Sequence, residues 1–250
     1  MIASEQEKRF SDACDAVIGV GAERSGIGTL GEKTLHAVIK RYIEPREELH
    51  EVKCKRFVCD IKREDGIYEV QTRSFGSLGK KLEAFLPEYD VTVVYPLPHI
   101  KWLCWINTET SEVTPKRKSP KKGAVTDSFR ELYRIKQYLD HPHFHLKYVL
   151  LELVEYRYLD GWSNDGKKGS TRCDRLPERL IDEVDIISKD DYYKLIPDSL
   201  PKVFTAKDFA RSAKITDRSA GMALGVLKYL DKVVMVGKEG NRYLYEVKKQ

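Results

Sequence analysis

Residues 57–75 read FVCDIKREDGIYEVQTRSF, and the rest of the chain is best interpreted outward from this stretch. Two runs of alternating apolar and polar residues flank a charged turn that ends in Asp-Gly at 65–66, a pattern typical of a β-hairpin. Successive side chains of a strand point to opposite faces, so Glu69 and Gln71 share one face of the second strand. The first strand contributes Asp60.

The hairpin register decides whether Asp60 and Glu69 are neighbours. A two-residue Asp65-Gly66 loop pairs Asp60 with Gln71 and leaves Glu69 diagonal to Asp60 on the same face, about 7–8 Å away by Cα. A four-residue loop puts Asp60 directly opposite Glu69, whereas a three-residue loop separates them. Adjacent carboxylates repel each other, so they require a proton, bulk water or a cation.

Composition indicates a folded protein of one or two domains. The chain has 250 residues, of which 41% are hydrophobic and 33% charged, and its net charge is +5. This mildly basic balance suits a polyanionic partner. The first ten residues lack an apolar signal core, and no apolar run approaches the ~20 residues that span a bilayer, so we expect no membrane attachment. The cysteine count is five, without a CxxC pair, which favours a reducing cytoplasm over disulfides or a zinc knuckle.

The periodicity predicts an α/β fold with a mixed sheet. The helix at 77–86 lies between two strands, which is the crossover of a parallel pair. In chain order we expect helices at about 8–17 and 29–42, a strand at 50–55, the hairpin, the helix at 77–86, strands at 91–95 and 102–106, a polar loop at 107–126, a helix at 127–139, a strand at 146–159, a basic glycine-rich loop at 161–175 and a strand at 181–187.

Two motifs allow other interpretations of the function. Gly26, Gly28 and Gly31 spell GxGxxG before a helix, so a dinucleotide-binding enzyme is one alternative. The short run VIGV before these glycines and the hairpin after the helix fit a flexible glycine loop better. Alternate histidines at 141–145 suggest a metal site, although beside a proline they more often link a helix to a strand.

Residues 202–250 predict a separate unit after a hinge-like linker at 197–201. A capping box, Thr205 with Asp208, opens a helix that ends near 212, and a second helix follows at 217–230. Two short strands, at 233–236 and 242–247, complete an order that resembles a winged helix.

Cations are spread over both parts of the chain. The side chains that would contact DNA phosphates in the winged helix are Arg211, Arg218, Lys228, Lys238 and Arg242. Many winged helices bind only protein, which is the alternative for this unit. In the first part, Lys116, Arg117 and Lys118 lie in a loop that either contacts phosphates or is merely solvated.

The order of the acidic residues carries a resemblance. Glu32 on a leading helix, Asp60 on one strand and Glu69-Val70-Gln71 on the next resemble the PD-(D/E)XK nuclease superfamily, over about residues 26–106. The core of that superfamily is αβββαβ. With a winged helix at its end, the whole chain looks like an uncharacterised family of bacterial proteins.

The resemblance implies a restriction-endonuclease-like domain over residues 1–196 and a winged-helix DNA-binding domain over residues 202–250. It implies metal-dependent phosphodiester hydrolysis, with Asp60 and Glu69 as the principal ligands of Mg²⁺ or Mn²⁺. Glu32 would hold a second metal or a water. DNA is the expected substrate, RNA is not excluded, and a homodimer would suit a double-strand cutter.

Gln71 departs from the commonest pattern, in which the family has lysine. An amide carries no positive charge and is not a base at neutral pH, although it can position a water. Arg73 and Lys80 are the candidates to replace that charge, and Lys80 is also a candidate contact for nucleic acid. His36, one turn after Glu32, would assist a proton transfer. A DNA-binding or regulatory protein without catalysis on a nuclease-like scaffold is the main alternative.

Overall fold

The computed structural model describes residues 2–19, 33–161 and 170–248, so Glu32 and the GxGxxG glycines lie outside the described residues. The helices are α1 (Ser4–Ile18), α2 (Lys33–Ile43), α3 (Gly79–Phe85), α4 (Phe129–Leu132), α5 (Ala206–Ala213) and α6 (Asp217–Tyr229). The strands are β1 (His50–Cys54), β2 (Phe57–Arg63), β3 (Gly66–Val70), β4 (Val91–Ile106), β5 (Arg117–Lys118), β6 (Phe144–Tyr158), β7 (Thr171–Ile186), β8 (Val233–Glu239) and β9 (Arg242–Val247).

The predicted mixed α/β class is confirmed. Over the described residues, one seven-stranded sheet has the order β1-β2-β3-β4-β6-β7, with β5 paired to β4. The β3–β4 and β4–β6 pairs are parallel, and the remaining pairs of this sheet are antiparallel. The crossover between β3 and β4 runs through α3, as the helix between two strands predicts.

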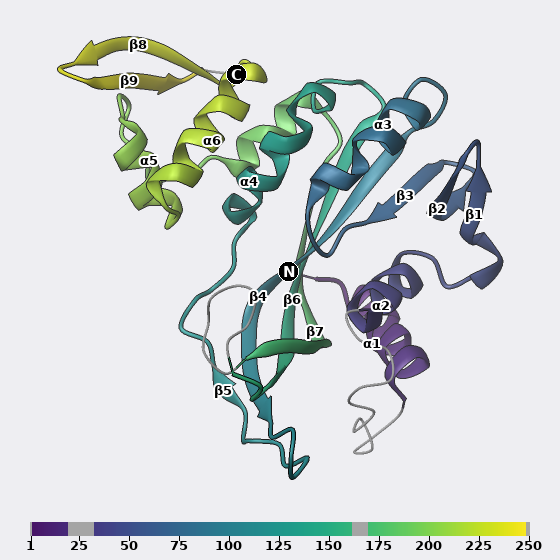
Figure 1. Ribbon diagram of the computed structural model, residues 1–250. Coiled ribbons are helices and arrows are strands. Elements are labelled where there is room, and N and C mark those ends of the chain that lie inside the picture. The colour runs from purple at the N-terminus through teal and green to yellow at the C-terminus, as the bar shows by residue number, and fades with distance from the viewer. Residues whose placement is uncertain (1, 20–32, 162–169, 249–250) are drawn as a thin grey trace.

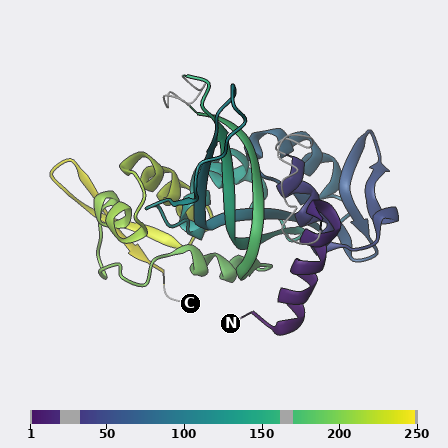
Figure 2. The ribbon, with the colours of Figure 1, turned by 90° about the horizontal axis from the view of Figure 1, so that it is seen from below.

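Helices cover both faces of the sheet. Helices α1 and α2 pack on one face, over an apolar cluster that includes Leu35, Ile39 and Leu151. On the other face, α3, α4 and the C-terminal helices share a larger cluster. Figure 2 shows β1–β3 and the C-terminal hairpin on opposite sides of the molecule. No helix in the described part of the chain is long and apolar enough to cross a membrane.

The hairpin register brings the two acidic positions face to face. Ile61 pairs with Tyr68 and Arg63 with Gly66, so the loop consists of residues 64–65 and not of Asp65-Gly66. Continued by one step, this register sets Asp60 opposite Glu69. The same pairing of Asp60 with Glu69 was expected for a four-residue loop, although the observed loop has two residues and begins one position earlier than Asp65-Gly66.

Several of the expected elements differ from the sequence-based assignment. The strands at 91–95 and 102–106 are one strand, β4, that continues through Pro96 and Pro98. Because β3 ends opposite Val94, β4 has a free edge there, where a proline costs no ladder hydrogen bond. The helix at 127–139 is instead a series of short turns broken by Ile135, with φ −118°. Part of the loop at 161–175 belongs to β7.

The C-terminal elements agree closely with expectation. Thr205 Oγ1 accepts from the Asp208 amide at 3.3 Å, and Asp208 Oδ2 accepts from the Thr205 amide at 2.9 Å, which is the predicted capping box of α5. Helix α6 and the β8–β9 hairpin follow in order. Phe209 of α5 packs against Phe129 of α4, with ring centroids 6.0 Å apart. The hydrophobic core therefore runs across the expected linker.

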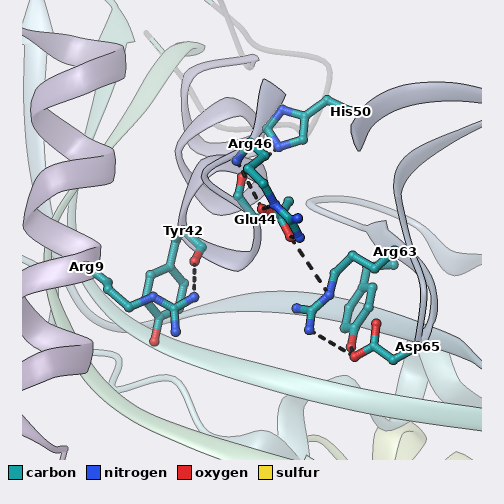
Figure 3. Close-up of polar contacts among 8 residues, drawn as sticks. Arg9, Tyr42, Glu44, Arg46, His50, Arg63 and Asp65 are labelled. Carbon is teal, nitrogen blue, oxygen red and sulfur yellow. Dashed lines mark hydrogen bonds and ion pairs between the residues drawn. The ribbon is translucent and has the colours of Figure 1, made fainter. Parts of the chain in front are cut away.

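A buried carboxylate fixes the end of α2 against β2 (Figure 3). The Glu44 side chain is 5% exposed and accepts from Arg46 Nε at 2.9 Å and from the Arg46 amide at 3.0 Å. Arg63 of β2 places its Nε 3.9 Å from the other oxygen, and His50 Nε2 lies 2.7 Å from the Glu44 carbonyl. The hydrogen bond from Arg46 is the main cause that lowers the pKa of Glu44 from 4.5 to about 2.

We expect Glu44→Gln to lower the free energy of unfolding by about 1–2 kcal/mol at pH 7, because most of the attraction to two arginines is lost. Since the folded-state pKa lies below the unfolded one, this stability is complete above pH 4.5 and disappears as the pH falls towards 2. Urea denaturation at several pH values measures it. The difference in free energy of unfolding between the native chain and Glu44→Gln should become smaller below pH 4.5. Glu48→Gln, at an exposed position nearby, should unfold with the same free energy as the native chain.

Gly66 closes the hairpin with φ +144°, and a Cβ there would lie 2.5 Å from the Asp90 carbonyl oxygen. We expect Gly66→Ala to destabilise the protein by about 2 kcal/mol or more, because backbone strain and a backbone clash add. In the described part of the chain, a Cβ added at Gly221 of α6 would have no atom within 4 Å beyond its own helix and chain neighbours. Gly221→Ala should instead stabilise by up to ~1 kcal/mol. Equal urea midpoints for the two variants would contradict the assigned hairpin geometry.

Candidate active site

Four charged or titratable side chains from four elements meet at the end of the hairpin. Asp60 comes from β2, Glu69 from β3, His36 from α2 and Lys81 from α3. The two acids stand on neighbouring strands by the register described above, while the helices bring His36 and Lys81 to them. The predicted neighbourhood of Asp60 and Glu69 is therefore present in the fold.

Asp60 is held in place by a backbone amide and a histidine. Its Oδ2 accepts from the Val70 amide at 2.8 Å, and His36 Nε2 lies 3.3 Å from the same oxygen. Burial raises the pKa of Asp60, but His36, the Val70 amide and the charge of Lys81 outweigh it, so the pKa falls below its ordinary value. Asp60 is thus an ionised carboxylate at neutral pH.

Glu69 is completely buried, at 0% exposed. Its Oε2 accepts from Lys81 Nζ at 2.7 Å, whereas its Oε1 is buried and has no hydrogen-bond partner among the residues that the structure describes. Burial and the charge of Asp60 raise the pKa of Glu69 to about 7, against the opposing effect of Lys81. A buried carboxylate oxygen without a partner is costly, so a ligand that paired with this atom would stabilise the folded protein.

A cavity of about 380 Å³ opens directly onto these groups. Gln71, the residue at the family's lysine position, and Arg73 both line it. The remaining lining side chains are polar or charged apart from one valine, and they are His36, Asp60, Glu69, Val70, Thr72, Ser74, Ser77 and Lys81. The cavity is large enough for a phosphate group with a metal ion and water.

The donor set suits a hard divalent cation. Asp60 and Glu69 supply facing carboxylates, and the unpartnered Glu69 oxygen is the atom that a cation would satisfy. Mg²⁺ often binds through one or two carboxylates and keeps several waters. Within the described ranges, no group of three His, Cys, Asp or Glu side chains gathers closely enough to hold a metal, and the third expected ligand, Glu32, lies outside them.

Lys81, not Lys80, brings a positive charge into the cavity. Lys80 is exposed and does not line it. The positions of the two lysines relative to the apolar residues of the helix distinguish them. Residue 81 lies three positions after Leu78 and four before Phe85, both buried, so it borders the apolar stripe, whereas residue 80 points away from it. The other candidate, Arg73, does line the cavity.

The other expected nucleic-acid contacts lie on exposed positions away from the cavity lining. Lys116, Arg117 and Lys118 are exposed; Arg117 and Lys118 form β5, which pairs with β4 at Trp102 and Leu103. Strand β5 thus extends the sheet on the side that β3 leaves. The expected phosphate contacts of the C-terminal unit are all exposed, namely Arg211, Arg218, Lys228, Lys238 and Arg242.

A larger cavity, of about 630 Å³, lies between residues 193–202 and the end of the chain. Its acidic lining residues are Asp198, which is exposed, and Glu246, which is half-buried. It therefore lacks the buried, closely paired carboxylates that distinguish the smaller cavity.

Comparison with known proteins places the chain in a family. Residues 33–187 match the family described as a domain of unknown function, DUF8091, and the chain belongs to that family. It is 32% identical over 228 residues to a protein of Treponema pallidum (strain Nichols) described as an uncharacterized protein, across 88% of this chain and 86% of that relative. No solved structure matches the chain. The matched region contains the smaller cavity, beside Asp60 and Glu69, and ends before the C-terminal unit.

We expect Lys81→Met to destabilise the protein by about 2 kcal/mol at pH 7.5, because it leaves the buried Glu69 without its cation. Lys80→Met removes the same charge from an exposed position and should change stability by less than ~0.5 kcal/mol. In the Lys81→Met background, Glu69→Gln should restore most of the loss, since a neutral amide needs no cation. Thermal or urea unfolding of the native chain, Lys81→Met, Glu69→Gln and the double variant yields the coupling energy between the two side chains. Equal effects of the two methionine substitutions would show that the Lys81–Glu69 contact is not stabilising.

Proposed function

We propose that this member of the DUF8091 family is a metal-dependent nuclease that hydrolyses phosphodiester bonds of DNA. The observation that carries the proposal is the pair of facing carboxylates, Asp60 and Glu69, one of which has a buried oxygen without a partner in the described part of the chain. The pair opens onto a cavity of phosphate size with Lys81 at its wall. The proposal is further supported by the chain order α2, β1–β3, α3 and β4, which is compatible with the αβββαβ order that the resemblance implies.

Asp60 and Glu69 would hold Mg²⁺ or Mn²⁺, with Glu32 as a further candidate ligand. When bound, the ion would neutralise charge on the scissile phosphate and lower the pKa of the attacking water. His36 is a positioning residue, because its contact with Asp60 fixes the direction of that carboxylate.

Lys81 would supply the positive charge that Gln71 lacks. Its ammonium group reaches the cavity wall from α3 and is 24% exposed, so it is open to a ligand while it contacts Glu69. A cation there would stabilise the negative charge that develops on the phosphate oxygens. Gln71 would orient a water through its amide.

The C-terminal unit, in the order α5, α6, β8 and β9, is proposed as a winged helix that binds the nucleic acid at a distance from the bond that is cleaved. Its exposed cations fit phosphate contacts. Figure 1 shows this unit and β1–β3 on opposite sides of the molecule, so one strand of nucleic acid would have to span the molecule to contact both. A homodimer with two cavities would permit cleavage of both DNA strands.

A nuclease assay tests the proposal directly. Supercoiled plasmid, labelled single-stranded DNA and labelled RNA are incubated with the full chain in EDTA, Mg²⁺ or Mn²⁺. We expect cleavage only with metal, reduced about 100-fold or more in Asp60→Asn and Glu69→Gln, and reduced at least ~10-fold in Lys81→Met. Glu64→Gln, at an exposed position of the same hairpin, is the matched control and should cut normally.

A second readout does not depend on activity. Mn²⁺ should raise the melting temperature of the native chain and of Glu64→Gln, but not that of Asp60→Asn, because only a ligand that binds the folded state stabilises it. DNA binding without cleavage under every metal condition would contradict the proposal and favour a DNA-binding scaffold without catalysis. Cleavage that survives in the Asp60→Asn/Glu69→Gln protein would place the active site elsewhere.

A further inference from the structure

A row of exposed side chains connects the carboxylate cavity with the C-terminal unit. It lies on the short 3-10 turns η4 (Tyr133–Tyr138), which pack against η2 (Phe75–Leu78) on one side and against α6 on the other. Turn η2 carries Ser77, which lines the cavity. Figure 1 shows α4, from which η4 continues, between α3 and α6. The surface of η4 therefore joins the two parts of the chain.

Arg134 of η4 stands at the rim of the cavity. A Cβ added at Gly76 would lie 3.5 Å from Arg134 Nη1 and 3.5 Å from the hydroxyl of Ser74, which lines the cavity. Arg134 Nε lies 3.3 Å from Glu131 Oε2, an oxygen that also accepts from the Phe75 amide at 3.0 Å. Glu131 thus orients the guanidinium group beside the cavity, while the Arg134 side chain stays 43% exposed.

Two exposed tyrosines follow, one from each part of the chain, with a lysine beside both. Tyr133 is 45% exposed and Tyr229 of α6 is 43% exposed. Lys136 Nζ lies 5.3 Å from the centre of the Tyr133 ring and 5.6 Å from that of Tyr229. The Tyr229 hydroxyl donates to the Gln137 carbonyl at 3.3 Å. A Cβ added at Gly225 would lie 3.1 Å from the Tyr133 ring. Packing thus fixes both rings at the surface.

The ammonium group of Lys136 contacts these rings and not an acid. In the part of the chain that the structure describes, no carboxylate pairs with it. A cation that rests on aromatic rings can contact a phosphate without giving up an ion pair. Lys228, directly before Tyr229, is exposed and adds a further positive charge. Cations and aromatic rings therefore alternate along this surface.

We propose that Tyr133, Arg134, Lys136 and Tyr229 form a binding surface for single-stranded DNA, the tyrosine track, which guides one strand from the carboxylate cavity to the C-terminal unit. The two cations contact phosphates, and each tyrosine stacks on a base. The identity of the ligand as DNA rests on the proposed nuclease function.

The aromatic rings identify a single strand as the ligand. In a duplex the bases stack on one another and present only their edges in the grooves, so an exposed tyrosine finds no free base face. A single strand offers base faces and phosphates in turn, which matches the alternation of rings and cations in the tyrosine track. Because every base has a π face, we expect binding without sequence preference.

Binding without metal separates this inference from the proposed activity. Fluorescence anisotropy in EDTA measures the affinity of the full chain for a labelled single-stranded oligonucleotide and for the duplex of the same sequence. Tyr133→Ala/Tyr229→Ala should bind the single strand about 10-fold or more weakly and the duplex less than ~3-fold more weakly. Tyr133→Phe/Tyr229→Phe keeps both rings and should bind as the native chain does. Equal losses for the single strand and the duplex would overturn the inference.

A second variant tests the cations at exposed or half-buried positions, where folding is not at risk. Arg134→Gln/Lys136→Gln should reduce the salt slope of single-strand binding by about 1.4, corresponding to two lost phosphate contacts. The matched control is Lys53→Gln/Arg56→Gln, which removes the same charge from two exposed positions at the β1 edge of the sheet and should keep the slope. Equal reductions in the two variants would overturn the inference, as would a native chain that does not bind the single strand.

The cleavage assay completes the separation. If the native chain cuts single-stranded DNA with Mn²⁺, Tyr133→Ala/Tyr229→Ala should raise KM about 10-fold with little change in kcat, since the stacked bases are remote from the reacting bond. Normal binding and cutting by this variant would overturn the inference and leave the proposed nuclease intact. Weakened single-strand binding by the variant, together with a native chain that never cuts, would support the tyrosine track and contradict the nuclease.

Discussion

The burial of Glu69 beside Asp60 is the constraint on which the rest of the site depends. Two carboxylates on facing strand positions, one of them wholly excluded from water, cost free energy unless a positive charge compensates them. The pKa of Glu69, raised from 4.5 to about 7, expresses this cost, because the folded state holds a proton that the unfolded chain releases. The folded state is therefore penalised increasingly as the pH rises from 4.5 to 7, and a cation bound by the carboxylates would remove the penalty.

The surrounding fold keeps this unfavourable pair in one geometry. Asp60 and Glu69 follow from the β2–β3 register, which Gly66 permits by its close approach to Asp90. Helix α2 carries His36 to Asp60, and the ion-paired Glu44 fixes the end of that helix to β2. The core on both faces of the sheet thus stabilises a site that does not stabilise itself, as is common where strain serves function.

The hairpin and the C-terminal unit could be predicted from sequence because their signals are local. Strand alternation placed Asp60 and Glu69 on one face for a loop of two or four residues, and the Thr205–Asp208 capping box marked the start of α5. The path of β4 through Pro96 and Pro98 could not be predicted, since it depends on where the distant β3 ends. Lys81 was missed although its helical phase distinguishes it from its neighbour, because a helix of seven residues shows its apolar stripe only weakly.

The origin of the positive charge has a structural consequence. A lysine at position 71 would belong to the same stretch of chain as Glu69, and its place would follow from the strand alone. Lys81 reaches Glu69 from a helix whose position depends on the packing of Leu78, Leu82 and Phe85 in the core. Charge balance in the site is therefore coupled to the seating of α3. A core substitution beneath α3 would disturb the site electrostatically without any contact with it, whereas an exposed substitution on the outer face of the same helix would not.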